Sequence, residues 1–289
     1  MGAIVYILDS FTKDNNGGNP AGVVLDADGL SDIQMLNIAK QVGFSETAFV
    51  HKSDRATFKV RFFTPNSEVD LCGHATIATF SLLRSKGLID NGVFLQETKA
   101  GILNIVVDHE IVYMNQTLPE YYDLLDKLEI AGSLNISSND YLDNLPVQIV
   151  STGLKDIIVP VKSIEILFSI QPDLGKIAEL SKKYNIVGFH VFSLETKFDG
   201  TAHCRNFAPL YDINEESATG TSNGALACYL HNYGVINKKY PYDFVFEQGY
   251  SMGKPSEILA HLKIEENIIN EVQVGGRAII RDVLNIQLL

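Results

Sequence analysis

An internal repeat is the feature of this sequence that most constrains its fold. Residues 61–89 and residues 205–236 both begin with Arg-x-Phe-x-Pro and then cross an acidic loop to a glycine, Gly73 in one copy and Gly220 in the other. Each copy carries a second glycine fourteen residues later, followed by an apolar pair that ends in Ile. The second copy has three extra residues in its loop and none elsewhere. This spacing indicates an internal duplication.

Each copy predicts the same local structure. Alternation of Arg and Phe before proline is typical of a strand, because proline donates no hydrogen bond to a sheet ladder. Apolar residues at helical spacing follow the first glycine, which predicts helices that end at Gly87 and Gly234 in the C-cap position. Further strands are expected at residues 5–8, 93–96, 147–150 and 244–247, and helices at residues 31–43 and 171–184.

The repeat therefore predicts an α+β protein with two similar domains. We expect each domain to be a mixed β-sheet wrapped around its central helix. Residues 1–118 are assigned to the N-terminal domain and residues 119–277 to the C-terminal domain, and the 289-residue length suits two domains of about 100–150 residues each. A strand at residues 278–280 could return to either domain, and residues 278–289 are grouped with the first.

Charge and cysteine content narrow the functional classes. The formal net charge of −12 argues against a nucleic-acid or anionic-membrane partner. The three cysteines form no CxxC pair, which argues against a disulfide scaffold and a tetrahedral zinc–thiolate site. No stretch approaches the roughly 20 apolar residues of a membrane helix, and the apolar run at residues 3–8 is too short for a signal peptide. We therefore expect a soluble, cytoplasmic protein.

Several cofactor motifs are missing from the sequence. It contains no GxxxxGK[ST] loop, no GxGxxG after a strand, no HExxH and no carboxylate cluster at metal-binding spacing. His190 and His203 are isolated in the sequence and are interpreted as structural. These observations predict a protein that works without a nucleotide cofactor or a metal.

The two predicted helix starts are the first candidate binding positions. A helix start presents unpaired backbone N–H groups and a partial positive charge, which together suit an anion such as a substrate carboxylate. Small residues at Gly73, Gly220 and Thr221 would let a ligand approach the backbone closely. If the two starts face each other across a cleft, they would also stabilise developing negative charge. The alternative is that these glycines only ease tight strand-to-helix turns.

Three titratable residues near these positions are candidate catalytic groups. His74 opens the first helix, where the positive end of the dipole favours the neutral imidazole. Glu216 precedes the second helix, whereas its neighbours Asp212 and Glu215 are interpreted as helix caps. Glu46 lies among apolar residues at a predicted helix-to-strand junction, a partly desolvated position that suits proton transfer. The alternatives are a structural histidine, a third cap and an exposed edge residue.

At these positions the chain resembles the PhzF (phenazine biosynthesis-like) family, part of the diaminopimelate epimerase-like fold. The match keeps the family's order from residue 18 to residue 256 and is specific for the family. One departure in its last piece is Lys254, where the family usually has Arg. The matching pieces are GNPAGV at 18–23, SETAF at 45–49, RFFTP at 61–65, EVDLCGHAT at 68–76, FAP at 207–209, TGT at 219–221, QG at 248–249 and MGKPS at 252–256.

The resemblance implies a cofactor-independent isomerase with its active site in a cleft between two epimerase-like domains, no metal, and commonly a homodimer. It implies that Glu46 is the general acid/base that moves a proton on a small carboxylate substrate, with His74 and Glu216 as further catalytic residues. Glu216 stands where the family usually has an aspartate. The substrate-binding residues implied by the resemblance are Asn19, Gly73, Gly220 and Thr221.

Departures from the family pattern bear on the reaction. Ser217 replaces a proline and Thr221 a serine. The longer carboxylate of Glu216 and the added methyl group of Thr221 would shrink or reshape the pocket, which puts in doubt trans-2,3-dihydro-3-hydroxyanthranilate, the best-known family substrate. The related diaminopimelate epimerases use two cysteines, whereas here Cys72 is matched by Thr219. Because a threonine hydroxyl is far too weak an acid to replace a thiol, a two-thiol mechanism is disfavoured and Cys72 is interpreted as a small buried residue. Amino-acid epimerisation by another mechanism, or non-catalytic binding of a small molecule, remain the alternatives.

Overall fold

The computed structural model describes residues 2–235 and 242–287. Two compact units are present: a first unit of residues 1–115 and 275–289, and a second unit of residues 116–274. Ile236, the last residue of the second repeat copy, and residues 1, 288 and 289 of the predicted domains lie outside the described residues. The boundary predicted after residue 118 lies three residues beyond the end of the first segment.

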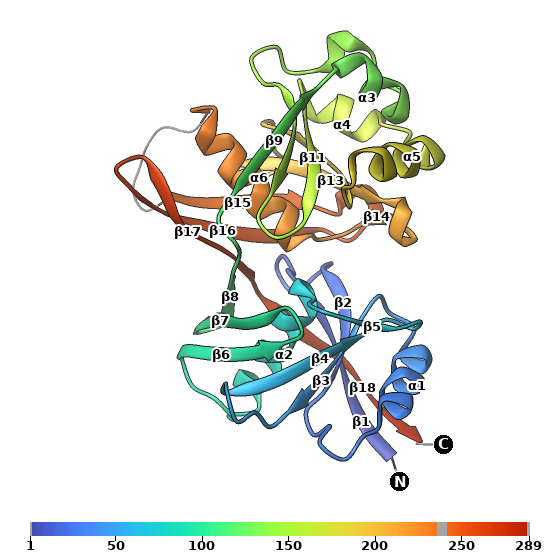
Figure 1. Cartoon of the computed structure of the whole chain (residues 1–289), viewed down its shortest axis with the longest axis vertical. Helices are drawn as coiled ribbons and strands as arrows, with labels where there is room; N and C mark the ends of the chain where they lie inside the picture. The colour runs from blue at the N-terminus through green and yellow to red at the C-terminus, as the bar shows by residue number, and fades with distance from the viewer. Residues whose placement is uncertain (1, 236–241, 288–289) are drawn as a thin grey trace. The chain divides into compact units, whose positions relative to one another are not determined.

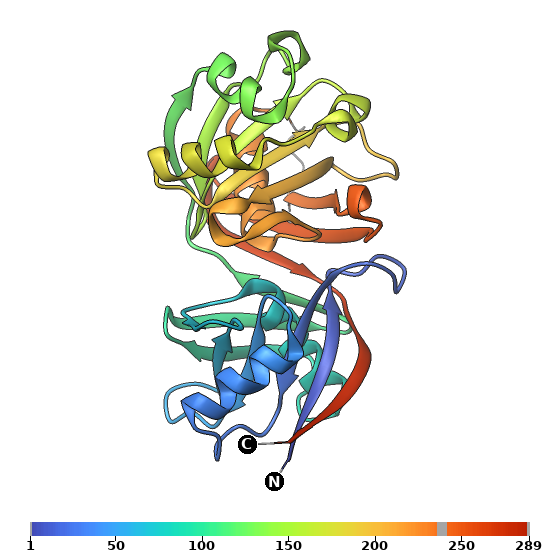
Figure 2. The same ribbon diagram turned by 90° about the vertical axis from the view of Figure 1, so that its right-hand side faces the viewer.

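The first unit is a mixed sheet around one helix, with a second helix, α1 (Asp32–Val42), outside it (Figure 1). Its central helix is α2 (Gly73–Ser85). Its final strand lies antiparallel beside the first, so both ends of the chain belong to this unit (Figure 2). The strands are β1 (Gly2–Ser10), β2 (Asn19–Val24), β3 (Thr47–His51), β4 (Phe58–Phe63), β5 (Glu68–Val69), β6 (Gly92–Thr98), β7 (Gly101–Asp108), β8 (Ile111–Asn115) and β18 (Ala278–Gln287).

The second unit has the same plan around α6 (Gly220–Asn232). Three further helices belong to it: α3 (Lys127–Leu134), α4 (Ile164–Ser169) and α5 (Leu174–Tyr184). Among the described residues, no helix of either unit is long and apolar enough to cross a bilayer. The strands are β9 (Glu120–Leu125), β10 (Val147–Ser151), β11 (Lys155–Val161), β12 (Gly188–Ser193), β13 (Ala202–Ala208), β14 (Ile213–Glu216), β15 (Tyr242–Gln248), β16 (Ser256–Glu265) and β17 (Ile268–Gly276).

Strand pairing confirms the duplication. In the first unit β2 runs parallel to β3, β3 is antiparallel to β4, β4 takes the short β5 antiparallel and β6 parallel, and β6 is antiparallel to β7. In the second unit β11, β12, β13, β14, β15 and β16 repeat these pairings in the same order and sense. The central helix follows the short strand in both units, as the repeat predicted.

Both central helices are buried on nearly every side, which explains why their sequences are apolar or small all round. Their ends differ by one residue from the prediction. Lys86 and Tyr233 are the C-caps, and the glycines follow them as Gly87 and Gly234 with φ of 67° and 65°. The left-handed turn needed just past each helix end accounts for these two glycines.

The outer helices follow local capping signals. Ser31 and Gln34 form a capping box at the start of α1, and Gly43 ends that helix in the left-handed conformation, as predicted for residues 31–43. The start of α5 was predicted three residues too early. Asp173 caps that helix by accepting a hydrogen bond from the backbone of Lys176, so the helix begins after it.

A partly buried ion pair recurs in the two repeat copies. Arg61 donates two hydrogen bonds to Glu68, at 2.7 and 2.9 Å, and Arg205 donates two to Glu215, both at 2.9 Å. Each guanidinium also lies over the ring of the phenylalanine two residues further on, at 5.2 and 4.9 Å from the ring centre. The interpretation of Glu215 and Asp212 as helix caps was therefore wrong: Glu215 holds its acidic loop to β13, and Asp212 ends a 3₁₀ turn.

Candidate functional site

The junction between α1 and β3 positions Glu46 in the first unit. The helix ends at Gly43, and three residues later the backbone carbonyl of Glu46 accepts a hydrogen bond from Gly22 as the parallel pairing of β2 and β3 begins. Its side chain is 18% exposed. The predicted position, partly desolvated between a helix and a strand, is what the structure has.

The start of α2 positions the histidine and the cysteine. Cys72 is the N-cap residue, and in the described structure no side chain caps the helix start by a hydrogen bond. His74 follows one residue into the helix and is 7% exposed, and its carbonyl accepts a hydrogen bond of 2.7 Å from Ser10 on β1. The neighbouring backbone N–H groups are therefore available to an anion, as a helix start provides.

The side chains of Glu46 and Cys72 both lie beside the imidazole ring of His74. The Oε2 atom of Glu46 lies 3.4 Å from Nε2 of His74, and Sγ of Cys72 lies 3.4 Å from Nδ1 of the same ring. The hydroxyl of Ser45 is also 3.4 Å from Nε2. Oε2 of Glu46 is buried without a hydrogen-bond partner among the described residues, which is costly for a carboxylate unless a ligand completes the site.

The other first-unit candidates lie close to this group. Gly73 is the first residue of α2, between Cys72 and His74, and a Cβ added there would meet only Met114 at 3.5 Å. Asn19 is buried at the start of β2, opposite Ser10 in the ladder with β1. Because Ser10 contacts the backbone of His74, the sheet brings Asn19 to the same end of the unit.

In the second unit Glu216 is held at the end of β14, just before α6. Thr219 is the N-cap of α6, and its hydroxyl donates a 2.6 Å hydrogen bond to the carboxylate of Glu216. The side-chain amide of Gln248 donates both to the Thr219 hydroxyl, at 3.0 Å, and to the carbonyl of Glu216, at 2.9 Å. Gly220 is buried and Thr221 partly exposed at the start of the helix. Thr219, which stands where the first unit has Cys72, therefore orients the carboxylate of Glu216.

The sequence did not predict a buried polar network that includes residues of α6. It runs from Gln248 through Asn223, His190, Asn206 and Ser222 to Asp156, in hydrogen bonds of 2.6 to 3.2 Å. Burial raises the pKa of Asp156 to about 7, with the nearby charge of Glu216 adding to the rise and the Ser222 hydroxyl opposing it. Burial also lowers the pKa of His190 to about 4, so this imidazole is neutral. Its members come from five different elements, and no local sequence signal marks them as a set.

The contact between Cys72 and His74 was also missed. This group combines a Cys-x-His pair with an acid from another element, so no single sequence motif with metal-binding spacing contains it. Glu46, Cys72 and His74 place one oxygen, one sulfur and one nitrogen within 4.8 Å of each other. A Cys-x-His pair at a helix start was the signal available in the sequence.

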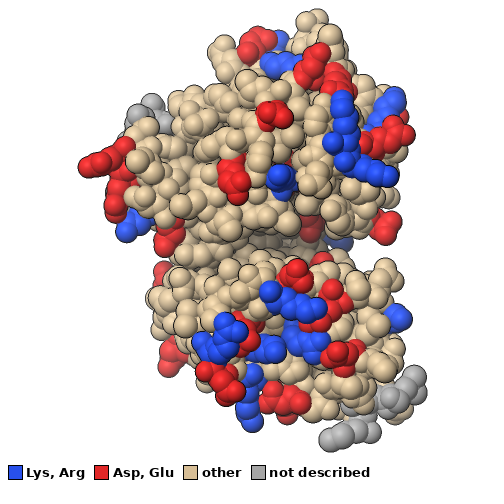
Figure 3. Space-filling view, in the orientation of Figure 1, with Lys and Arg blue, Asp and Glu red and all other residues tan. Residues whose placement is uncertain are grey.

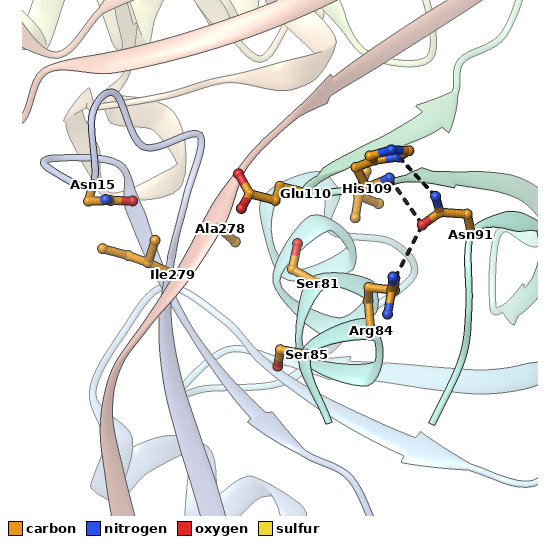
Figure 4. A pocket seen from close by; sticks show the side chains of 10 residues that line it. Asn15, Ser81, Arg84, Ser85, Asn91, His109, Glu110, Ala278 and Ile279 are labelled. Atoms are coloured by element: carbon orange, nitrogen blue, oxygen red, sulfur yellow. Dashed lines mark hydrogen bonds between the residues drawn. The ribbon is translucent and has the colours of Figure 1, made fainter. Parts of the chain in front are cut away.

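A separate polar pocket of about 560 Å³ opens elsewhere on the first unit (Figure 4). Arg84 donates to Asn91 across 3.2 Å, and the amide of Asn91 lies 2.9 Å from Nδ1 of His109. Ser81 and Glu110 also line it. None of the candidate catalytic residues lies along its wall, so we do not assign it to the candidate site.

Basic and acidic side chains are mixed on the surface of the protein (Figure 3). On the face drawn in Figure 3, basic side chains are interspersed with acidic ones on each unit. A nucleic-acid partner needs basic side chains gathered along the phosphates. On this face acidic side chains lie next to the basic ones, and the expected absence of a nucleic-acid partner stays a prediction.

Comparison with known proteins decides the family. A family model described as phenazine biosynthesis-like protein matches residues 8–282. The chain belongs to the PhzF family. It is 36% identical over 288 residues to an uncharacterized isomerase of Clostridium acetobutylicum, covering 96% of this chain and 95% of that protein. It is 28% identical over 282 residues to trans-2,3-dihydro-3-hydroxyanthranilate isomerase of Pseudomonas chlororaphis, covering 94% and 95%. As a PhzF protein, the chain is an isomerase.

Solved structures confirm the PhzF fold. A PhzF family protein of Bacillus anthracis matches with a TM-score of 0.91 and 33% identity over 99% of both chains. A hydroxyproline epimerase of Agrobacterium vitis matches with a TM-score of 0.62 and 13% identity over 99% of this chain and 92% of that one. At this identity the second match shows the fold alone, and it confirms the epimerase-like α+β class.

Proposed function

We propose that this PhzF isomerase works without a cofactor and moves a proton on a small carboxylate substrate, with Glu46 as its general acid/base. The observation that carries the proposal is the buried, unpartnered Oε2 of Glu46, 3.4 Å from His74 at an uncapped helix start. Among the described residues, no hydrogen bond explains why this oxygen is buried. A substrate C–H or N–H group approaching Oε2 would supply the missing contact.

In the proposed reaction Glu46 takes a proton from a carbon that is acidified by a neighbouring unsaturated group. The C–H bond breaks, its electron pair shifts the double bond along the skeleton, and the carboxyl group returns the proton to another carbon. The net change is an isomerisation that consumes no oxidant or reductant. Backbone N–H groups at the start of α2, beside Gly73, would hold the substrate's anionic group, and His74 would orient Glu46.

Residues of the second unit form a separate set in this proposal. Glu216 is proposed as a second acid, oriented by the 2.6 Å hydrogen bond from Thr219. Gly220 and Thr221 would bind substrate polar groups at the start of α6, and Asn19 would do so in the first unit. The predicted cleft and the homodimer stay predictions.

Solvent deuterium incorporation tests the role of Glu46. The first probe is trans-2,3-dihydro-3-hydroxyanthranilate, the substrate named for the Pseudomonas chlororaphis relative, followed by small unsaturated carboxylates. Glu46→Gln should abolish incorporation into a substrate that the unchanged protein labels, while binding of that substrate stays nearly intact. Glu110→Gln, a change at an exposed acid of the same unit, is the matched control and should label substrate normally. Full exchange in Glu46→Gln would refute the assignment.

Amino-acid epimerisation is the second candidate, because the Cys72 thiol contacts His74. The equivalent position holds Thr219, whose hydroxyl is donated to Glu216, so a paired-thiol mechanism is not supported. Loss of optical activity from a single amino-acid enantiomer would favour this candidate over the isomerisation of a double bond.

A further inference from the structure

The group formed by Glu46, Cys72 and His74 has the composition of a zinc site. It supplies one carboxylate oxygen, one thiol sulfur and one imidazole nitrogen, and in the described part of the chain it is the one group of three or more His, Cys, Asp and Glu residues with such atoms within 4.8 Å. Zinc accepts these three ligand types together. Other histidine–carboxylate contacts, such as His261 with Asp243, offer two ligands.

One pair of ligand atoms, from Glu46 and His74, already has the spacing of a tetrahedral site. Zinc bonds of about 2.0–2.3 Å place neighbouring ligand atoms roughly 3.3–3.6 Å apart. The Nε2 atom of His74 lies 3.4 Å from Oε2 of Glu46 and 3.9 Å from Sγ of Cys72. Sγ lies nearer to Nδ1, at 3.4 Å, so binding of one ion by all three groups requires the Cys72 side chain to rotate toward Nε2.

Burial and an oxygen without a hydrogen-bond partner among the described residues suit a cation, although the start of α2 carries a partial positive charge. Oε2 of Glu46 is buried and makes no hydrogen bond to any described residue, although it faces the imidazole. Cys72 and His74 are each 7% exposed, so little water competes for their ligand atoms. The Ser45 hydroxyl, 3.4 Å from Nε2, is exposed and free to rotate away. Three protein ligands leave the fourth tetrahedral position open, as in exchangeable zinc sites.

We propose that Glu46, Cys72 and His74 bind one Zn²⁺ ion and that bound zinc blocks the isomerase. Binding replaces the thiol proton of Cys72, which leaves to solvent, and uses the neutral imidazole of His74 and the carboxylate of Glu46. The carboxylate is then coordinated and no longer takes a proton from substrate. Blocking rests on the proposed role of Glu46, whereas binding does not.

Direct binding measurements test the site. Metal-free protein is titrated with Zn²⁺ by calorimetry and with Cd²⁺ by ultraviolet absorbance, where a cadmium–thiolate bond gives a charge-transfer band. One ion per chain and a cadmium–thiolate band are expected. Cys72→Ala should remove the band and weaken zinc binding at least about tenfold, since even outer-shell changes cost metal sites that much. Cys228→Ala is the matched control, because this buried thiol of the second unit should not contribute.

The outcomes separate the metal site from the catalytic proposal. Absence of binding, absence of the band, or Cys72→Ala binding zinc like the unchanged protein would each overturn the site. Circular dichroism of the metal-free variants checks folding, and Cys72→Ser replaces the alanine variant if that one does not fold. Undiminished deuterium exchange by zinc-saturated protein would overturn blocking alone. If the protein binds zinc at this site but exchanges no deuterium with any substrate, the proposed function is wrong and the metal site is confirmed.

Discussion

The buried carboxyl of Asp156 should make the stability of the second unit depend on pH, and Asp156→Asn should remove that dependence. The side chain is 2% exposed, and one oxygen accepts a 2.6 Å hydrogen bond from Ser222. The other oxygen is buried without a hydrogen-bond partner among the described residues. Burial raises the pKa of Asp156 to about 7, and the charge of Glu216 adds to the rise. Asparagine has the same shape and no charge.

The size of the effect follows from the two pKa values of Asp156. In the unfolded chain the carboxyl ionises near its ordinary pKa of 3.8, whereas in the folded protein it stays protonated up to about pH 7. Its contribution to stability is therefore fully present below pH 3.8 and is lost as the pH rises to 7. The loss is about 1.4 kcal/mol per pH unit, or about 4 kcal/mol in total above pH 7.

Urea unfolding at several pH values measures this effect. The protein has no tryptophan, so circular dichroism follows the transition. The free energy of unfolding of Asp156→Asn minus that of the unchanged protein isolates the one carboxyl, because all other titrations cancel. This difference should grow by about 3 kcal/mol between pH 5 and pH 7 and then level off. Asp143→Asn, at an 80% exposed acid of the same unit, should give a difference near zero throughout.

Two results would refute the reasoning. A difference between Asp156→Asn and the unchanged protein that does not vary with pH would show that Asp156 ionises near its ordinary pKa in the folded protein. A variant that is less stable than the unchanged protein at pH 8 would show that the ionised carboxylate has partners that asparagine cannot replace. In either case Asp156 would not be a neutral buried acid at the base of the polar network.

Three further substitutions have expected effects on the free energy of unfolding. The hydrogen bonds from Arg61 lower the pKa of Glu68 to about 2, and solvent screens this partly exposed pair, so Glu68→Gln should cost about 1–2 kcal/mol at pH 7, a loss that shrinks as the pH falls from 4.5 to 2; a constant cost would contradict this. Gly249→Ala should cost at least about 2 kcal/mol, because φ is 81° and a Cβ would lie 2.2 Å from the carbonyl oxygen of Lys254; a neutral effect in urea unfolding would exclude the clash. Tyr229→Phe should cost about 1 kcal/mol, since its hydroxyl donates a 2.6 Å hydrogen bond to a buried backbone carbonyl; unchanged stability would mean that water replaces the hydroxyl.

Much of the fold could be predicted because its signals are local and occur twice. Ser31 and Gly43 bound a helix by capping, and proline after the Arg-x-Phe strands ends a ladder, so these elements need no long-range information. Repetition then implied that both halves share one topology. The boundary was less precise because β17 runs without a break from the second unit into the first, passing through Gly275 at the change without a turn.

The candidate site was predictable in part, for a related reason. Glu46 and His74 were each marked by their place at the end of an element, and the parallel pairing of β2 and β3 brings them within 3.4 Å. The orientation of the Cys72 side chain depends on the N-cap geometry, which a sequence does not display. Asp156 could not be found at all, because a buried carboxyl looks like a surface acid until the elements that cover it are known.

The two repeat copies share their backbone conformation but differ in the side chains around it. The backbone of each half places a helix start without a side-chain cap after its short acidic strand, so both copies share the position at which we expect an anion to bind. The side chains around that position have diverged. In the first unit Cys72 and Glu46 crowd an imidazole and leave a carboxylate oxygen without a partner, whereas in the second unit Thr219 spends its hydroxyl on Glu216. The Glu46 oxygen without a hydrogen-bond partner among the described residues can accept a contact from a ligand, whereas the Glu216 carboxylate is held in place by Thr219. We therefore expect the half with the unsatisfied carboxylate to move the proton.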